Sequence, residues 1–153
     1  TSDTGFVTKT TPEGAWAQVN PMVLAVAADA SFVARGFAGD IDHLAGLIGK
    51  GIQHKGFAFI DVLQPCVSFN FKNTYKWYRE RVYKLDEDKA YDPTDRGAAF
   101  VKAQEWSARI PLGVIYKKDK PTYESSLLAL KDMPLVRQPL DPRQIEPLLD
   151  EFV

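Results

Sequence analysis

Residues 57–66 have the sequence FAFIDVLQPC, in which Phe57–Leu63 is an apolar run interrupted only by Asp61. A continuous apolar run of this length, closed by Gln64-Pro65, is typical of a strand buried on both faces, as strands of parallel sheets are. We therefore expect Phe57–Leu63 to be a central strand of an α/β domain.

The segment before this strand has the pattern of a capped helix. Asp40 is a candidate N-cap, and Gly56 follows the basic pair His54-Lys55 at the expected end. Between them, apolar residues recur at helical spacing at Ile41, Leu44, Leu47, Ile48 and Ile52. The short apolar segment Ser31–Arg35 precedes this helix and is a candidate buried strand. Strand, helix and strand in this order predict a parallel unit with a right-handed crossover.

Further elements are expected on both sides of this unit. Asn20-Pro21 is a helix start, and Met22–Ala30 is apolar on every side, which predicts a buried helix. Thr1–Val19 and Lys84–Arg96 have the composition of loops. The pattern also predicts helices over 73–81, 98–106, 122–130 and 143–151, a strand over 112–116 and an extended connector over 134–142.

Composition excludes several classes of protein. The chain has 153 residues, of which 45% are hydrophobic and 25% charged, so it has the balance of an ordinary globular domain. Lys and Arg number 19 and Asp and Glu number 20, giving a net charge of −1. No overall field attracts nucleic acid or a membrane surface, so we expect neither as a partner. No apolar run approaches the ~20 residues that span a bilayer.

The single cysteine indicates the compartment. Cys66 has no second cysteine with which to form an internal disulfide, and the simplest expectation is a reducing cytoplasm. Thr1–Thr11 lacks the basic and apolar regions of a secretory signal. The chain also lacks an initiator Met, which suggests a processed chain, an expression product or a fragment.

Cys66 is the first candidate for chemistry. It follows the predicted strand at its carboxyl end, the edge at which open parallel sheets bind ligands. A thiol in this place can be a nucleophile, a metal ligand or a buried structural group. His43 and His54 share a face of the predicted helix but are three turns, or ~16 Å, apart. They cannot share a metal, and we expect both on the surface.

The segment Lys72–Lys84 interleaves basic residues with aromatic ones. Such a pattern can stack bases and hold phosphates, or it can be an amphipathic helix whose aromatic residues pack against the core and whose charges are solvated. The near-zero net charge favours the second interpretation. The sequence contains no Walker-type phosphate loop, no GxGxxG fingerprint and no GxSxG elbow.

Several motifs, taken in order, resemble one enzyme family. They are TKTTPEG at 8–14, Asn20-Pro21, SFVARG at 31–36, QHKG at 53–56, IDVLQPC at 60–66, Phe69-Asn70, NTY at 73–75, Trp77-Tyr78 and RVY at 81–83. Together they are similar to the beta subunit of 2-oxoacid:ferredoxin oxidoreductases. The resemblance is specific from Thr1 to about Leu85 and continues weakly beyond it.

The resemblance implies a function and a set of cofactors. The beta subunit of this family binds thiamine diphosphate and magnesium and carries one four-iron four-sulfur (4Fe-4S) cluster. With an alpha subunit it oxidatively decarboxylates a 2-oxoacid, forms acyl-coenzyme A and passes electrons to ferredoxin. The Leu63–Cys66 motif maps onto the fourth cluster cysteine, so the resemblance implies that Cys66 is a metal ligand. Pro65, Val67 and Asn70 are the groups expected to surround it.

The chain also departs from the family pattern. The other three cluster cysteines, the Gly-Asp-Gly segment for magnesium and diphosphate and a Tyr-Gly-Leu-Thr-type segment are absent. One thiolate cannot hold a 4Fe-4S cluster, so we expect the isolated chain to be inactive and all three cofactors to need residues of a missing N-terminal half. We assign no catalytic acid or base, because the cofactor supplies the carbanion stabilisation in this chemistry.

The resemblance also predicts the organisation of the chain. Residues 1–85 are expected to be the C-terminal part of a three-layer, parallel-sheet domain that binds thiamine diphosphate, and residues 86–153 an irregular C-terminal extension. A strand such as Phe57–Leu63 needs neighbours on both edges. We therefore expect an exposed apolar face that another chain covers.

Two other interpretations remain at this point. The first is a non-enzymatic α/β binding module that uses the face of Lys72–Lys84. The second is the C-terminal domain of another thiamine-diphosphate enzyme of the acetolactate synthase type, which would not need a cluster ligand at Cys66. The sequence does not indicate which 2-oxoacid is used.

Overall fold

A computed structural model describes residues 4–14, 19–139 and 141–152, and the chain divides into two compact units, residues 1–120 and 121–153. The first unit contains a mixed sheet with helices on its two faces, and the second contains only short helical turns. The elements of the first unit are α1 Pro21–Ala27, β1 Phe32–Phe37, α2 Ile41–Gln53, β2 Ala58–Leu63, α3 Tyr75–Arg79, β3 Val82–Lys84, the 3-10 turn η1 Leu85–Glu87, α4 Arg96–Gln104 and β4 Ile110–Lys117.

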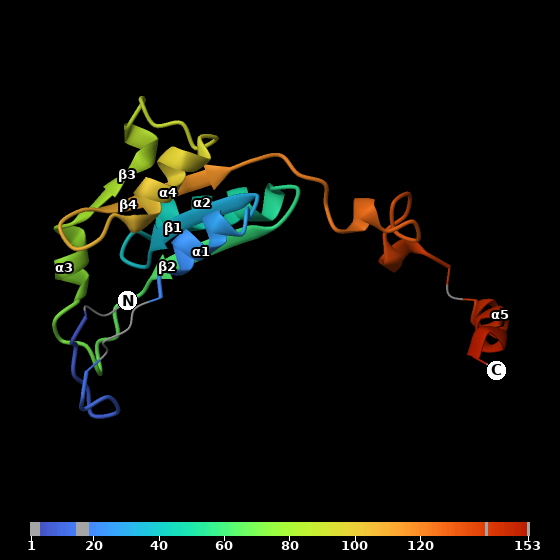
Figure 1. Ribbon diagram of the computed structural model, residues 1–153, viewed down its shortest axis with the longest axis horizontal. Coiled ribbons are helices and arrows are strands. Elements are labelled where there is room, and N and C mark those ends of the chain that lie inside the picture. Colours follow the sequence, from blue (N-terminus) through green and yellow to red (C-terminus); the bar gives the residue numbers. More distant parts are fainter. Residues whose placement is uncertain (1–3, 15–18, 140, 153) are drawn as a thin grey trace. The chain divides into compact units, whose positions relative to one another are not determined.

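The four described strands lie in the order β2-β1-β4-β3 (Figure 1). β1 and β2 are parallel and are joined by α2, which confirms the predicted strand, helix and strand unit. β4 runs antiparallel to β1 and parallel to β3, so the sheet is mixed. The three-residue strand β3 was not predicted from the sequence.

The predicted central position of the strand at Phe57–Leu63 is wrong among the described strands. β2 is at the edge of the sheet, where Phe57, just before it, and Val62 within it are 65% and 38% exposed. β1 is the central strand instead, and all six of its residues are buried. An apolar run indicates that a strand is suited to burial. Its place in the sheet depends on the strands with which it forms hydrogen bonds, and these are distant in the sequence.

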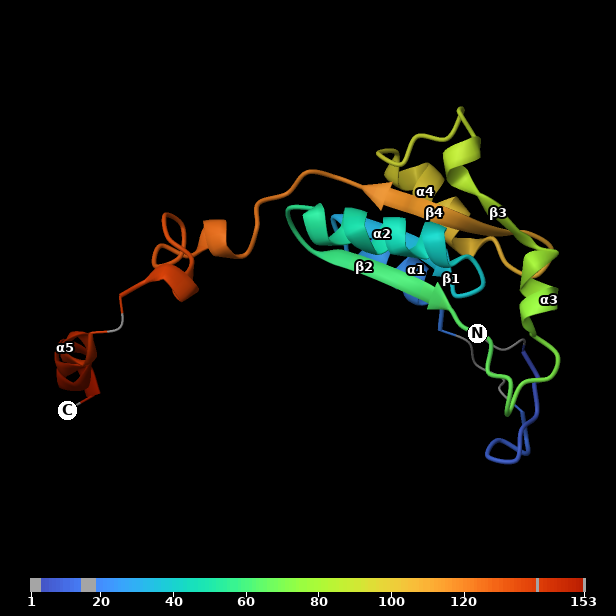
Figure 2. The ribbon, with the colours of Figure 1, turned by 180° about the vertical axis from the view of Figure 1, so that it is seen from behind.

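The helices form a layer on each face of the sheet, as expected for a three-layer domain. α2 lies on one face, where Leu47 packs against Phe32 and Ala34. α1 and α4 lie on the other face (Figure 2), where Met22 and Val26 share a cluster with Ala99. A further cluster at the carboxyl end of β1 and β2 consists of Phe37, Leu63, Tyr78, Ile110 and Leu112.

Helix α1 begins where the sequence predicts and ends earlier. The Asn20 Oδ1 atom accepts hydrogen bonds from the backbone N–H groups of Met22 and Val23, each at 3.1 Å. The helix stops at Ala27 rather than at residue 30, because Asp29 adopts a left-handed conformation with φ of 58°. Burial on every side is also wrong, since Leu24 is 58% exposed.

The compact unit extends beyond Leu85, the boundary that the sequence predicted for the first domain. The reason is β4, which lies in the predicted extension but pairs with both β1 and β3. The unit ends at Lys120. The predicted functional boundary at Leu85, between a cofactor-binding part and a C-terminal extension, stays a prediction.

The second unit is less helical than predicted. The helix expected over 122–130 is only a 3-10 turn, because the hydroxyls of Ser125 and Ser126 donate to the carbonyl of Thr122 and compete with helical bonding. The connector expected to be extended contains another 3-10 turn. The described elements are η2 Glu124–Ser126, η3 Leu135–Arg137, η4 Pro142–Ile145, α5 Glu146–Leu149 and η5 Asp150–Phe152.

Candidate functional site

Cys66 lies in the loop that follows β2, at the carboxyl end of the parallel pair. Leu63 and Pro65 on its N-terminal side are buried, so the chain entering the loop is anchored in the core. Asn70 donates its backbone N–H to the Cys66 carbonyl at 2.9 Å, which closes the turn. The Cys66 side chain itself is exposed. The interpretation of Cys66 as a buried structural thiol is therefore wrong.

A small pocket of about 120 Å³ opens beside Cys66. Its lining combines this thiol with aromatic rings and with amide and hydroxyl groups. The lining residues are Phe6, Thr8, Gln64, Pro65, Cys66, Phe69, Asn70, Asn73 and Tyr78. The N-terminal loop and the segment after β2, which are distant in sequence, thus share the pocket. An exposed thiol in the lining of a pocket that also has amide and hydroxyl groups is suited to bind a metal centre or another ligand.

The two asparagines of this pocket are buried and bonded to each other. The Asn70 Oδ1 atom accepts the backbone N–H groups of Lys72 at 3.0 Å and Asn73 at 2.8 Å, and its Nδ2 donates to the Asn73 Oδ1 at 3.0 Å. Asn73 is only 1% exposed, and its Nδ2 has no hydrogen-bond partner in the described part of the chain. The sequence pattern predicted Asn70, but not Asn73, as a residue near Cys66. The one local signal for Asn73 is that it follows Asn70 by three residues.

Cys66 does not belong to a larger group of metal-ligating side chains among the described residues. In residues 4–14, 19–139 and 141–152, no group of three or more His, Cys, Asp and Glu side chains is placed to hold a metal ion. A metal centre at Cys66 with three or more protein ligands would therefore need residues outside the described ones.

The histidines are less exposed than expected. The His43 side chain is 10% exposed, and its Nε2 lies 3.8 Å from the Asp86 carboxylate. Burial is the main cause that lowers the pKa of His43, with a further contribution from Lys84. His54 is half-buried, and its Nε2 lies 3.0 Å from the Ser31 Oγ. The prediction of two surface histidines is wrong because His43 in α2 lies near Asp86 and His54, just after α2, lies against Ser31.

The basic and aromatic segment Lys72–Lys84 packs against the core. Tyr78 is 1% exposed, and the Arg81 guanidinium stacks over the Trp77 ring with 4.3 Å between its Cζ and the ring centroid. The Tyr83 ring is likewise covered by Arg109, from outside the segment, at 4.2 Å. These contacts favour the amphipathic interpretation over a surface that stacks bases.

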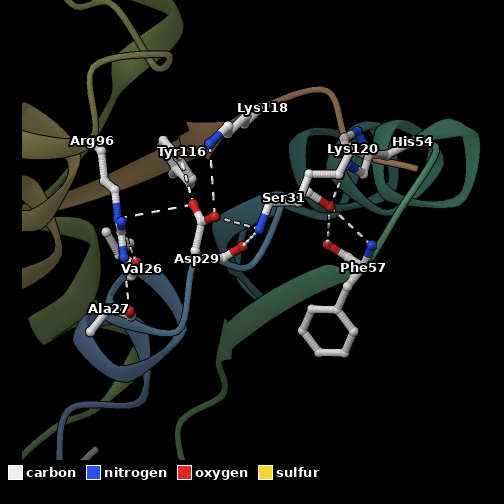
Figure 3. Close-up of polar contacts among 10 residues, drawn as sticks. All are labelled: Val26, Ala27, Asp29, Ser31, His54, Phe57, Arg96, Tyr116, Lys118 and Lys120. Carbon is white, nitrogen blue, oxygen red and sulfur yellow. Dashed lines mark hydrogen bonds and ion pairs between the residues drawn. The ribbon is translucent and has the colours of Figure 1, made fainter. Parts of the chain in front are cut away.

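The amino end of β1 carries a polar cluster around Asp29 (Figure 3). Lys120 and Lys118 form ion pairs with the Asp29 carboxylate, and Tyr116 donates its hydroxyl to it at 3.2 Å. The hydrogen bond from Lys120, followed by the charges of both lysines, lowers the pKa of Asp29. This cluster joins the turn after α1 to the end of β4, so it fixes the sheet at the end opposite Cys66.

Comparisons with known proteins point to one family. A sequence profile for the C-terminal part of the pyruvate ferredoxin oxidoreductase beta subunit matches residues 66–132, beginning at Cys66 itself. The 2-oxoacid:ferredoxin oxidoreductase subunit beta of Saccharolobus solfataricus is 41% identical over 134 residues, which are 80% of this chain and 44% of the relative. Subunit beta of 2-oxoacid:ferredoxin oxidoreductase 1 of Aeropyrum pernix is 41% identical over 151 residues, 88% of this chain and 48% of the relative.

The chain belongs to the family of 2-oxoacid:ferredoxin oxidoreductase beta subunits. A solved structure agrees, namely the 2-oxoglutarate:ferredoxin oxidoreductase from Magnetococcus marinus with 2-oxoglutarate, coenzyme A and succinyl-CoA bound. It is 30% identical with a TM-score of 0.77, covering 97% of this chain and 50% of that chain. The chain spans about half the length of the curated beta subunits that it matches.

The predicted membership of this beta-subunit family and the predicted α/β fold are both confirmed. The assignment of Cys66 to a cluster stays a prediction. None of the helices in the described ranges has the length and apolar character needed to cross a membrane.

Proposed function

We propose that this chain is part of the beta subunit of a 2-oxoacid:ferredoxin oxidoreductase and that Cys66 is a ligand of a 4Fe-4S cluster. The observation that carries the proposal is the exposed Cys66 thiol, which lines a pocket in the loop that follows β2. A ligand there is held by the rigid anchor of Leu63 and Pro65, which are buried.

The residues around Cys66 fit an iron–sulfur centre. Thiolate is the usual protein ligand of such clusters, and hydrogen-bond donors to sulfur are a regular part of the surroundings. The pocket supplies the donor groups of Gln64 and Asn73, together with the rings of Phe6 and Phe69 in its lining. Aromatic rings next to a metal centre limit the access of water and lower the local dielectric constant.

In this proposal, the other three ligands of the cluster come from polypeptide outside this chain. A 4Fe-4S cluster has four cysteine ligands, and Cys66 is the single cysteine of this chain. We propose that the N-terminal half of the beta subunit supplies the other three thiolates. The same half is proposed to bind thiamine diphosphate and magnesium. Thiamine diphosphate, when bound, supplies the carbanion stabilisation of the decarboxylation.

The assembly is proposed to oxidise a 2-oxoacid to an acyl-coenzyme A and to pass the electrons through the cluster to ferredoxin. The alpha subunit, ferredoxin, coenzyme A and the 2-oxoacid are its partners. The names of the relatives support this reaction class, and no residue described above selects one 2-oxoacid. The chain's own role in this reaction is to position the cluster. We also propose a cytoplasmic location, because a reducing compartment keeps the Cys66 thiol free of disulfides.

The partner polypeptide is proposed to cover an apolar stripe on α2. Ile41, Ile48 and Ile52 recur on one helix face and are 75%, 42% and 80% exposed. Gly46 and Gly49 have no side-chain or backbone neighbours within 4 Å of the position that a Cβ would take, so another element can approach α2 closely. The free edge of β2 lies beside this helix. A contiguous apolar surface of this kind is typical of an interface.

The test is Cys66→Ser in the assembled enzyme, produced with the complete beta subunit and the alpha subunit. We expect loss of the visible absorbance and electron paramagnetic resonance (EPR) signal of the cluster, because a hydroxyl is a poor iron ligand. Ser68→Ala, two residues away in the same exposed loop, is the matched control and should keep both signals. A Cys66→Ser enzyme with its full iron content and an unchanged EPR spectrum would overturn the proposal and favour a binding module.

A further inference from the structure

The Asn73 side chain has a donor without a partner in the described part of the chain. Asn73 is 1% exposed, and its Nδ2 has no hydrogen-bond partner among the described residues. A buried N–H group without a partner destabilises the folded protein, because it has lost its hydrogen bond to water and gained none in return. Proteins seldom retain such a group, so an acceptor from outside the described residues is the natural explanation.

The position of this donor is fixed by the neighbouring turn. The Asn73 Oδ1 accepts the Nδ2 of Asn70 at 3.0 Å, and the Asn73 backbone N–H is held by the Asn70 Oδ1 at 2.8 Å. Thr74, the next residue, caps α3 through a bond from the Trp77 N–H at 3.3 Å. With the oxygen engaged, the amide group leaves its two Nδ2 hydrogens for another acceptor.

The acceptor belongs in the pocket that Asn73 lines together with Cys66. The pocket measures about 120 Å³, and the Cys66 thiol is exposed at it. Sulfur atoms of an iron–sulfur centre accept N–H hydrogen bonds, and these bonds set its reduction potential. An N–H donor stabilises the more negative, reduced form of the centre and therefore raises the potential.

We propose that Asn73 is a positioning residue for the iron–sulfur centre, with its Nδ2 donating a hydrogen bond to a sulfur atom at Cys66, either the cysteine Sγ or a bridging sulfide. This inference rests on the proposed function, because it needs a cluster at Cys66. The inference adds to that function a residue, Asn73, that sets the reduction potential of the cluster. Asn70 acts through Asn73 by holding the amide in place.

The test compares the midpoint potential of the cluster in the assembled enzyme and its variants. Asn73→Leu removes the donor without adding charge, and Asn73→Asp keeps the oxygen that accepts from Asn70. We expect both variants to shift the potential to more negative values. Ser68→Asp is the matched control, since it adds a charge in the same loop at an exposed position where solvent and salt screen it. Its shift should be smaller than that of Asn73→Asp.

A second measurement covers the case in which the Asn73 variants lose the cluster. The wild-type enzyme is labelled with ¹⁵N-asparagine, and its reduced cluster is examined by pulsed EPR. We expect a weakly coupled ¹⁵N nucleus, which disappears in Asn73→Asp wherever that variant retains the cluster. The absence of such a coupling in the wild type, or an unchanged potential in Asn73→Leu, would mean that a water molecule is the acceptor and would overturn the inference.

The two proposals fail in different ways. If Cys66→Ser keeps the cluster signal, the proposed function fails together with the inference. If Cys66→Ser loses the cluster while Asn73→Leu leaves the potential unchanged, the function stands and only the role of Asn73 is wrong.

Discussion

Arg35 on β1 and Asp61 on β2 lie directly opposite each other in the parallel register, and their side chains are joined with 3.0 Å between Nε and Oδ2. Arg35 is 2% exposed and also faces the Trp106 ring, with 5.6 Å between its Cζ and the ring centroid. Its Nη1 has no hydrogen-bond partner in the described part of the chain. Asp61, the single charge in the apolar run from which the fold was predicted, therefore balances a buried cation.

Removing the acidic partner should cost more than removing both charges. We expect Asp61→Asn to lower the free energy of unfolding by about 3 kcal/mol, because it leaves the buried Arg35 charge uncompensated. The double variant Arg35→Met with Asp61→Leu should lie within about 1 kcal/mol of the wild type, since it replaces the pair by apolar groups. Equilibrium urea unfolding of the chain measures both changes.

The exposed residue Asp119 provides the control for this pair. Asp119→Asn removes the same charge at the surface and should change stability by no more than about 0.5 kcal/mol. A cost for Asp61→Asn as small as that of Asp119→Asn would show that the ion pair does not stabilise the β1–β2 pairing.

Two glycines of the segment that joins β1 to β2 should respond to alanine in opposite directions. Gly49 is inside α2 with nothing within 4 Å of the position that an alanine Cβ would take, so Gly49→Ala should stabilise the chain by about 0.5–1 kcal/mol. Gly56 has φ of 127°, and a Cβ there would lie 2.4 Å from the Ser31 Oγ. Gly56→Ala should therefore destabilise by about 1–3 kcal/mol.

Thermal unfolding of the two variants distinguishes these effects, with the melting temperature rising for Gly49→Ala and falling for Gly56→Ala. The clash at Gly56 would also disturb Ser31, whose Oγ accepts the Phe57 N–H at 2.9 Å. Equal melting temperatures for the two variants would contradict the described turn between α2 and β2.

His43 should make the folded chain sensitive to mild acid. Burial lowers its pKa below the ordinary value of 6.5, helped by Lys84 and Lys50, while Asp40 and Asp86 act in the opposite direction. Below pH 6.5 the unfolded chain binds a proton at this position that the folded chain resists, so stability falls as the pH decreases through this range. The loss is at most about 1.4 kcal/mol per pH unit for one proton.

Urea unfolding of the wild type and of His43→Leu between pH 8 and pH 5 measures this effect. The variant should lose less stability than the wild type between pH 6.5 and pH 5. Asp40, whose pKa is lowered chiefly by its hydrogen bond with Lys84, acts in a separate range, because its contribution is lost only near and below its ordinary value of 3.8. Parallel pH profiles for the wild type and His43→Leu would disprove the role of His43.

Local patterns in the sequence sufficed to predict the helix starts and the site loop. The caps at Asn20 and Asp40 were correctly predicted because each depends only on bonds to the next three residues. The place of Cys66 in the loop after a strand likewise follows from a local stop signal at Pro65, whereas its exposure was not predicted. The edge position of β2 depends on pairing between distant segments, and this information is absent from a local pattern.

Local sequence patterns were also insufficient to predict the residues of the pocket. Asn73 became a candidate only when its burial and its unpartnered Nδ2 were known, and both depend on the packing of α3 against the core. The strand β3 was missed for a similar reason, because a segment as short as Val82–Lys84 is a strand only through its pairing with β4. Tertiary contacts of this kind override weak local propensity.

The apolar stripe on α2 should behave as an interface. In the isolated chain, Ile48→Lys with Ile52→Lys should reduce the fluorescence of a dye that binds apolar surface and should reduce self-association in size-exclusion chromatography. Both side chains are exposed, at 42% and 80%, so the free energy of unfolding should change by no more than about 0.5 kcal/mol per site. In the assembled enzyme the same variants should weaken association, because two charges would be buried without partners.

The control for this stripe is Gln53→Lys, which adds a charge at an exposed position of the same helix without removing apolar surface. It should leave dye binding and assembly near wild-type levels. If the double isoleucine variant assembles as well as Gln53→Lys does, the α2 stripe is a solvent-exposed face in the complete enzyme. The covering polypeptide would then have to lie along the free edge of β2, where Phe57 and Val62 are exposed, and Val62→Lys would become the variant that blocks assembly.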